Sequence, residues 1–285
     1  MDVAADFVLG VVLGVPLTWL AVRLGRRLQL LDVPVGIKVH RDPMPHTGGA
    51  AIIATMLIAE LALGLPRPLL AGAFLMWAVG FVDDIRALGP RTKLLLEIVP
   101  LLVAAVPLGF EPPALLLTVA FGLFLVNAFN VIDGLDGLAG GVALISVLGL
   151  ALTIRSSEVI ATAAVLAGAL TAFLLFNLHP ARIFLGDQGS LLLGFFLWIL
   201  PLQQYATHRH VWAVLLGALV FLSFPLVNAV FVITRRLAAR SALLVGRRDH
   251  LYDVLNARWG LRSTLLICWS IAAIWMLAGS FAFGV

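Results

Sequence analysis

Apolar residues form nearly continuous runs of about 20 residues along most of this chain, which is the length a membrane-spanning helix needs. A spanning β-strand would instead show segments of roughly 10 residues with alternating polarity. Because backbone polar groups must be satisfied internally within a bilayer, the pattern predicts an all-α, polytopic integral membrane protein. Ten transmembrane helices are expected, at residues 3–22, 48–65, 68–82, 93–109, 113–131, 138–154, 158–178, 189–206, 210–234 and 263–284.

The composition agrees with this prediction. Of the 285 residues, 62% are hydrophobic and 12% are charged, whereas a soluble domain is about 45–50% apolar and about 25% charged. The N-terminal residues lack the basic segment of a cleaved signal peptide, so residues 1–22 are interpreted as a first span. No internal repeat or long linker divides the chain, and a single domain over residues 1–285 is expected.

The basic residues predict the orientation of the chain in the membrane. All lysines and arginines except Arg67, Arg155 and Arg209 fall in loops that would lie on one side. Cytoplasmic loops carry an excess of Lys and Arg, so this side is predicted to be the cytoplasm. The net charge of +4 is explained in this way, without a nucleic-acid partner. An even number of spans then places both termini outside the cytoplasm.

Aspartates at the ends of the predicted spans are the main candidates for chemistry. A carboxylate beside hydrocarbon is costly, so each is a functional-site hypothesis. All of them fall on the predicted cytoplasmic side, where they would build one metal and phosphate site. They are Asp83, Asp84, Asp133, Asp136 and Asp187.

Polar residues near these aspartates extend the candidate site. Lys93 begins a span, and because a cation is unfavourable at a helix N-terminus, a bound phosphate would account for it. Asn127, Asn130 and Asp133 are spaced by three, which places them on one face of a helix beside a polar cavity. Asp187 offers a hard oxygen ligand for Mg²⁺. The alternatives are a solvated helix end for the aspartate pair, hydrogen bonding between helices for the asparagines, and a helix N-cap for Asp187.

Two further loops on the same side carry histidines. His46 lies in a proline-stiffened loop directly before the span that begins at Gly48. In the long segment 235–262, a short amphipathic helix would place Arg247, His250 and Asp253 on one face. The alternative for this segment is a basic interfacial helix that contacts anionic lipid head groups.

Taken together, these motifs resemble the polyprenyl-phosphate N-acetylhexosamine-1-phosphate transferase superfamily, also called glycosyltransferase family 4. The resemblance covers nearly the whole chain, with the motifs in the same order. Two departures are visible: His250-Leu-Tyr252 stands where the translocase of the family has a run of histidines, and Asn228 stands where many members have Asp. The matching segments are 43–49, 83–93, 127–141, 186–190 and 248–252.

The resemblance implies an enzyme that transfers an N-acetylhexosamine-1-phosphate from a UDP-sugar to a polyprenyl phosphate such as undecaprenyl phosphate, releasing UMP. It would initiate lipid-linked cell-surface glycan synthesis, in a branch similar to that of O-antigen and lipopolysaccharide, at the cytoplasmic face of the bacterial inner membrane. The implied cofactor is Mg²⁺, with Mn²⁺ as the alternative ion. A homodimer is left open.

The resemblance also distributes roles among the residues. Those implied to be catalytic are Asp83, Asp84, Lys93 and His250. Those implied to bind substrate are His46, Asn127, Asn130, Asp133, Asp136, Arg247 and Arg248. Asp187 and Asp133 are implied to bind the metal. Within the aspartate pair, Asp83 is favoured as the base because it lies deeper in the membrane helix.

Three other functions are weighed against this interpretation. The first is the phospho-MurNAc-pentapeptide translocase of peptidoglycan synthesis, which the changed histidine motif disfavours. The second is a cation-coupled transporter, whose site would lie near the bilayer midplane, often with internal repeats. The third is a structural membrane protein, which would show no Mg²⁺ dependence.

Overall fold

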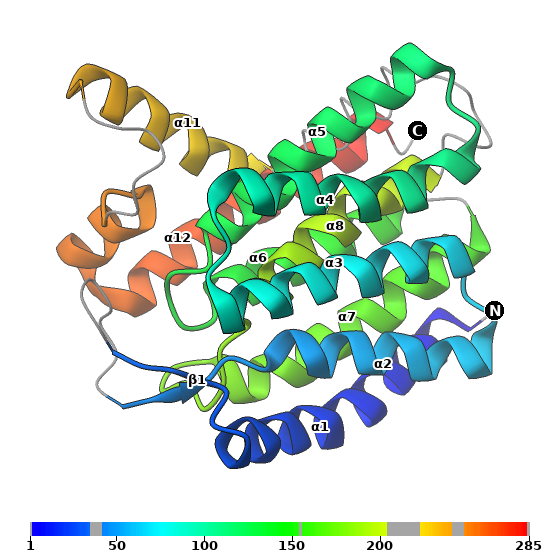
Figure 1. Cartoon of the computed structure of the whole chain (residues 1–285), viewed down its shortest axis with the longest axis horizontal. Coiled ribbons are helices and arrows are strands. Elements are labelled where there is room, and N and C mark those ends of the chain that lie inside the picture. Colours follow the sequence, from blue (N-terminus) through cyan, green and yellow to red (C-terminus); the bar gives the residue numbers. More distant parts are fainter. Residues whose placement is uncertain (1, 35–41, 154–155, 204–222, 241–247, 284–285) are drawn as a thin grey trace.

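The computed structural model describes residues 2–34, 42–153, 156–203, 223–240 and 248–283 as a bundle of helices with one short hairpin (Figure 1). The strands β1 (Leu31–Asp32) and β2 (Met44–Pro45) pair antiparallel. A short 3₁₀ turn, η1 (Val106–Leu108), precedes α5. The helices are α1 (Val3–Arg27), α2 (Gly48–Leu63), α3 (Arg67–Arg86), α4 (Pro90–Ala105), α5 (Pro112–Val131), α6 (Leu138–Thr153), α7 (Ser157–Asn177), α8 (Asp187–Gln203), α11 (Ser223–Ala238) and α12 (Leu251–Phe283).

Five of the described helices are long and apolar enough to cross a membrane: α1, α3, α5, α7 and the part of α12 at 251–278. The apolar helices α2 and α6 are shorter. These observations agree with the prediction of an all-α polytopic membrane protein. The predicted number of ten spans is not confirmed, and the predicted boundary between the spans at 189–206 and 210–234 lies outside the described residues.

The segment that ends in the last span agrees in part with its prediction. The tenth span was expected at 263–284, after a separate short helix. In the structure α12 begins at Leu251 and is interrupted by non-helical backbone at Gly260, where φ is 75° and ψ is 170°, so a short helix does precede the span. Because His250 precedes the helix, His250 and Asp253 do not share a helical face as predicted. Arg247, the third member of that face, lies outside the described residues.

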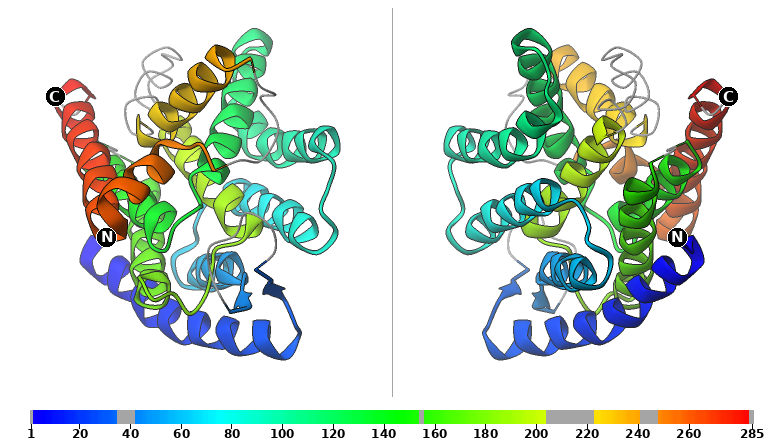
Figure 2. Two further views of the ribbon diagram at one scale, coloured as in Figure 1. Left: turned by 90° about the vertical axis from the view of Figure 1, so that its left-hand side faces the viewer. Right: turned by 90° about the vertical axis from the view of Figure 1, so that its right-hand side faces the viewer.

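Helix α8 forms the centre of the bundle. Every residue from Gln188 to Leu202 is buried, and α8 packs against α2, α3 and α5. Figure 2 shows α1 along one edge of the bundle and α5 with α11 at the opposite edge. The first turn of α8 therefore lies among the ends of other helices, which is where the aspartates are found.

Two glycines allow this close packing at the start of α8. A Cβ atom at Gly80 of α3 would overlap the backbone of Asp187 and Gln188, and one at Gly49 of α2 would overlap the backbone of Gly189. The absence of a side chain lets α2 and α3 approach the backbone of α8 directly. This contact brings the end of α3 against the residue that begins α8.

Candidate active site

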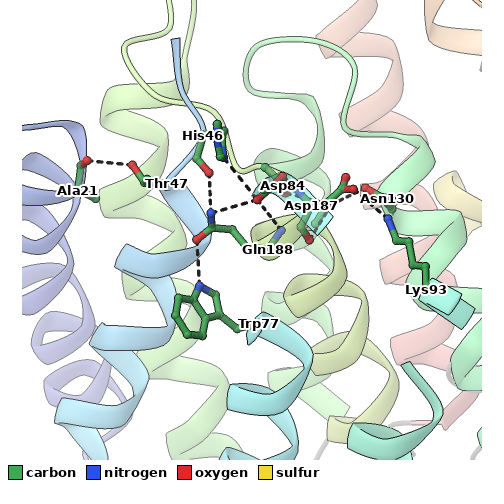
Figure 3. Close-up of polar contacts among 11 residues, drawn as sticks. Ala21, His46, Thr47, Trp77, Asp84, Lys93, Asn130, Asp187 and Gln188 are labelled. Atoms are coloured by element: carbon green, nitrogen blue, oxygen red, sulfur yellow. Dashed lines mark hydrogen bonds and ion pairs between the residues drawn. The ribbon is translucent and has the colours of Figure 1, made fainter. Parts of the chain in front are cut away.

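A lysine joins two of the predicted site aspartates. Lys93 Nζ lies 2.7 Å from Asp83 Oδ2 and 2.9 Å from Asp187 Oδ2, and its side chain is 12% exposed. The three residues come from the start of α4, the end of α3 and the start of α8 (Figure 3 shows Lys93 and Asp187). A bound phosphate was expected to account for Lys93 at this helix start, and the structure shows that the carboxylates of Asp83 and Asp187 also balance its charge. Contact of Lys93 with a phosphate stays a prediction.

The second aspartate of the pair has different partners. Asp84 accepts hydrogen bonds from the backbone N–H groups of Asp187 and Gln188 at 2.8 and 3.2 Å, and from Gln188 Nε2 at 3.0 Å. Asp84 therefore holds the beginning of α8 in place. Asp83 faces the lysine, and it also accepts from the backbone N–H of Leu88 at 2.6 Å.

His46 belongs to the network around Asp84 (Figure 3). Its Nδ1 lies 3.5 Å from Asp84 Oδ2, and its backbone oxygen accepts from Gln188 Nε2 at 2.9 Å. Gln188 Oε1 in turn accepts from Trp77 Nε1 at 3.0 Å. Burial alone would lower the pKa of His46, but the carboxylate of Asp84 outweighs it and the pKa is raised. His46 thus links the loop before α2 to α3 and α8.

The two asparagines of α5, Asn127 and Asn130, make hydrogen bonds with different partners. The carboxamide of Asn130 lies 2.6 Å from Ser190 Oγ. In the orientation that satisfies both of its polar atoms, it donates to Asp187 Oδ1 at 3.0 Å and accepts from Lys93 Nζ at 3.0 Å. Asn127 instead donates to Glu97 Oε2 at 2.6 Å. Only Asn130 therefore joins the lysine and its aspartates directly.

Glu97 was not identified from the sequence. It is fully buried in α4, one helical turn after Lys93. The available signal was an acid four residues after a site lysine, within an apolar run.

Asn177 was also missed. It is buried at the end of α7, where Oδ1 accepts from Gly137 N and Nδ2 donates to Ile183 O, so it ties the loop after α5 to the loop before α8.

Asp133 lies beside the lysine-bridged aspartates, but not on the predicted helical face. Helix α5 ends at Val131, so Asp133 is in the turn that follows. Burial, then the nearby carboxylates of Asp187 and Asp84, raise the pKa of Asp133 to about 8. No hydrogen bond or ion pair of its carboxylate is seen within the described ranges. The carboxylate of Asp133 is therefore available to a ligand.

Asp136 points toward a different loop. Its Oδ2 lies 2.8 Å from His179 Nδ1 and accepts from Ala181 N at 3.2 Å. Both partners follow α7, in the loop that leads to α8. His179 was another residue that the sequence analysis did not select. Asp136 thus holds this loop, and it is not in contact with Lys93.

The histidine motif at 248–252 packs against the end of α5. The rings of His250 and Tyr252 stack with their centroids 5.2 Å apart and their planes at 5°. Tyr252 donates its hydroxyl to Val131 O at 3.1 Å, and a Cβ at Gly134 would overlap the tyrosine ring. His250 is therefore brought close to the turn that carries Asp133.

One arginine of this motif is described by the structure. Arg248 Nη1 lies 3.2 Å from Asp253 Oδ1, within the same segment. Arg247 lies outside the described residues. Of the described residues of this motif, His250 lies close to the turn after α5, and Arg248 pairs within its own segment.

The acids of the site suit a hard divalent cation that shares its shell with substrate. Within the described ranges, no group of three or more His, Cys, Asp or Glu side chains is arranged to hold a metal ion. Mg²⁺, however, is often bound by one or two carboxylates together with substrate phosphates. Asp187 and the unpaired Asp133 offer that number of carboxylates. The metal role of both residues stays a prediction.

Comparison with known proteins gives a consistent result. The sequence model of glycosyl transferase family 4 matches residues 67–204. The chain is 31% identical to the undecaprenyl-phosphate alpha-N-acetylglucosaminyl 1-phosphate transferase of Thermotoga maritima, over 89% of this chain and 82% of that protein. It is 28% identical to the probable undecaprenyl-phosphate N-acetylglucosaminyl 1-phosphate transferase of Bacillus subtilis, over 97% and 84%. It is 33% identical to the phospho-N-acetylmuramoyl-pentapeptide-transferase of Moorella thermoacetica, over 82% and 83%.

Proposed function

The chain belongs to the polyprenyl-phosphate N-acetylhexosamine-1-phosphate transferase superfamily, glycosyl transferase family 4, and we propose that it transfers an N-acetylhexosamine-1-phosphate from a UDP-sugar to a polyprenyl phosphate. The names of the relatives from Thermotoga and Bacillus support undecaprenyl phosphate as acceptor and N-acetylglucosamine as the sugar to test first. The observation that carries the proposal is the half-buried Asp83–Lys93–Asp187 contact, which joins the end of α3 to the starts of α4 and α8.

The proposed reaction exchanges one phosphoanhydride bond for another. An oxygen of the lipid phosphate attacks the phosphorus that bears the sugar, and the bond from that phosphorus to the bridging oxygen of UDP breaks. UMP leaves with the bridging oxygen, and the product is a polyprenyl diphosphosugar. Catalysis of phosphoryl transfer consists mainly of positioning and charge stabilisation. A site of oriented acids around one lysine suits both tasks.

The residues of the site would divide these tasks. Asp83 faces the polar centre, so it would orient or deprotonate the lipid phosphate. Lys93 and His250 would offset the charge of the phosphates. Mg²⁺, when bound by Asp187 and Asp133, would neutralise the diphosphate of the sugar nucleotide. Asp84 and Asp136 would act indirectly. Asp84 holds the first residues of α8, and Asp136 holds the loop after α7.

The location of the reaction is also part of the proposal. The chain has several apolar helices and belongs to a family of membrane enzymes, so it is a multi-pass membrane protein. We place its site at the cytoplasmic face because the basic loops lie at the same helix ends as the aspartates. A role in O-antigen or lipopolysaccharide synthesis stays a prediction.

The direct test uses the purified full chain with undecaprenyl phosphate and a panel of sugar nucleotides, following UMP release. We expect release with a UDP-N-acetylhexosamine. The panel includes UDP-N-acetylmuramoyl-pentapeptide, because the Moorella relative is named for that activity. Release with that donor alone would assign the chain to the translocase reaction. No release with any donor would contradict the proposed function.

The metal proposal has its own prediction. Asp187→Asn should keep the fold but reduce UMP release strongly, because loss of a metal ligand removes several kcal/mol of charge stabilisation. Glu60→Gln is the matched control, since the Glu60 carboxylate lies 3.5 Å from the exposed Arg67, at the other end of α2 from His46. EDTA should abolish turnover of the wild type, and Mg²⁺ should restore it. Normal turnover in EDTA would contradict the metal role.

A further inference from the structure

A buried amide in α11 holds the start of α12. Asn228 is fully buried, and its Oδ1 accepts a hydrogen bond from Leu251 N at 3.0 Å. Leu251 is the first residue of α12, and the first N–H groups of a helix have no partner within the helix. Asn228 therefore caps α12 from a neighbouring helix. The residue directly before this capped position is His250.

Asn228 and Tyr252 together fix the backbone around His250. Asn228 holds the position after the histidine, and Tyr252, two positions after it, stacks on the imidazole and is anchored to Val131 O. Within the part of the chain that the structure describes, neither Asn228 Nδ2 nor His250 Nδ1 has a hydrogen-bond partner, and both atoms are buried. Buried polar atoms without partners are rare and costly. Their occurrence in two residues that flank one capped turn indicates a functional constraint.

The charged side chains around His250 form ion pairs with one another. Asp249 pairs with Arg236 at 2.7 Å, and Asp253 pairs with Arg248 at 3.2 Å and accepts from His250 N at 3.3 Å. Arg235 also reaches this turn, through the backbone oxygen of Asp249 at 3.4 Å. Burial is the largest influence and lowers the pKa of His250, against the opposing effect of Asp253 and Asp249. Asn228 adds no charge to this balance.

We propose that Asn228 is a positioning residue for His250: it anchors the turn that carries the imidazole, and as a neutral amide it adds no further carboxylate to those of Asp249 and Asp253. The consequence for catalysis rests on the proposed function. A histidine that loses its proton near neutral pH can exchange protons with phosphate groups. A histidine held charged by an adjacent carboxylate would act only as a cation.

Asparagine and aspartate have nearly the same shape, which makes the test specific. Asn228→Asp keeps an oxygen that can accept from Leu251 N, but it adds a negative charge at the backbone of the residue that follows His250. An opposite charge within about 4–6 Å raises the pKa of a cation-forming group by roughly 1–3 units. Asn228→Ala removes the acceptor and adds no charge. Thr234→Asp is the matched control, because Thr234 is an exposed residue of the same helix.

The first measurement does not depend on activity. Diethyl pyrocarbonate reacts with neutral imidazole, so its rate of modification of His250, followed by peptide mass spectrometry across pH 5–9, reports the titration of this ring. We expect the midpoint of Asn228→Asp to rise by at least about one pH unit, a tenfold change in proton affinity. Wild type and Thr234→Asp should share one midpoint. An unchanged midpoint in folded Asn228→Asp would overturn the proposal.

The second measurement tests the anchor. Hydrogen exchange at Leu251 should quicken about tenfold or more in Asn228→Ala, and it should stay slow in Asn228→Asp and Thr234→Asp. If Asn228→Asp does not fold, this comparison still decides, because unchanged exchange in Asn228→Ala would overturn the proposal.

UMP release then separates the proposal from the proposed function. A matching shift in the pH–rate profile of Asn228→Asp would support both. A shift in the modification midpoint with an unshifted rate profile would support the positioning of His250 and contradict its role in the reaction. If the wild type releases no UMP from any donor, the proposed function fails, while the modification and exchange measurements still decide the role of Asn228.

Discussion

Asp83 and Asp84 are adjacent in sequence, yet they have different environments. Asp83 contacts Lys93, and Asp84 accepts three hydrogen bonds from the first residues of α8. A carboxylate with three donors around it contributes to the local structure, whereas one beside a lysine at the polar centre is placed to meet a substrate. The two residues should therefore differ in what their substitution changes.

The first prediction concerns this pair. Asp83→Asn should leave thermal stability near that of the wild type and lower kcat by about 10²–10⁴, the usual loss when a general base is removed. Asp84→Asn should instead lose about 1–3 kcal/mol of stability, because one of its oxygens becomes a donor that faces other donors. Thermal unfolding in detergent and UMP release measure the two effects.

The pH dependence of the same variants tests the chemical role. The second pKa of the lipid phosphate should be about 6, as for other phosphate monoesters. If Asp83 acts by ionising this phosphate, the defect of Asp83→Asn should shrink as the pH rises from 6 to 9. Equal, small and pH-independent losses in both variants would contradict a general-base role.

The second prediction concerns His46 and Asp84. The pKa of His46 is raised in the folded state because the effect of Asp84 outweighs burial. The ion pair therefore stabilises the fold fully below the unfolded pKa of about 6.5, and the stabilisation is lost as pH rises through the higher folded value. Thermal stability of the wild type, relative to His46→Gln, should fall on raising the pH above 6.5. A constant difference across pH 5–9 would show that the pair contributes nothing.

At the scale of helices, α4 and α5 meet through two polar contacts one turn apart. Lys93 faces Asn130, and Glu97 faces Asn127. In the second contact, Glu97 is fully buried. The hydrogen bond between Glu97 and Asn127 forms only when α4 and α5 have one position relative to each other. It should therefore hold the two helices in the arrangement that positions Lys93.

The third prediction tests that contact by a double-mutant cycle. Asn127→Leu leaves the carboxyl group of Glu97 without its donor and should cost about 1–3 kcal/mol or more. Replacing both residues by leucine should recover much of this loss, because no buried polar group is left unpaired. Unfolding in detergent gives the four stabilities. A double variant as unstable as the sum of the single variants would show that the two side chains do not interact.

At the scale of the whole molecule, the proposed reaction with a cytoplasmic sugar nucleotide requires the aspartate end of the bundle to face the cytoplasm. The end of α3 carries the aspartate pair and Arg86, whereas Glu111 precedes α5 and Ser157 begins α7. Positive loops at the aspartate ends indicate the cytoplasm. The single native cysteine, Cys268, is buried, so introduced cysteines can be labelled selectively.

The fourth prediction is the resulting pattern of labelling. Cysteine at position 86 should react with a membrane-impermeant maleimide only from the cytoplasmic side, and cysteine at position 111 or 157 only from outside. The parent protein, with Cys268 alone, is the control for background. External labelling at position 86 would place the aspartates on the wrong side for a cytoplasmic sugar nucleotide.

The amino-acid sequence by itself determined the helical class, the membrane location and the set of aspartates at the helix ends. These properties are encoded within contiguous segments: a run of apolar residues predicts a span wherever it packs, and a carboxylate at its end is visible without knowledge of its neighbours. The same reasoning identified His250 and Asn130 as candidates, because each lies in a short polar motif.

Only the tertiary structure decided which of these residues meet. Lys93 and Asp187 are 94 positions apart and share one contact. Glu97 was missed because its partner Asn127 lies on another helix, and nothing local marks Asn228 as the cap of Leu251. Contacts between helices depend on the rotation of each helix about its axis and on how closely backbones approach, as at Gly80. Those quantities are set by packing of the whole bundle, and no single segment contains them.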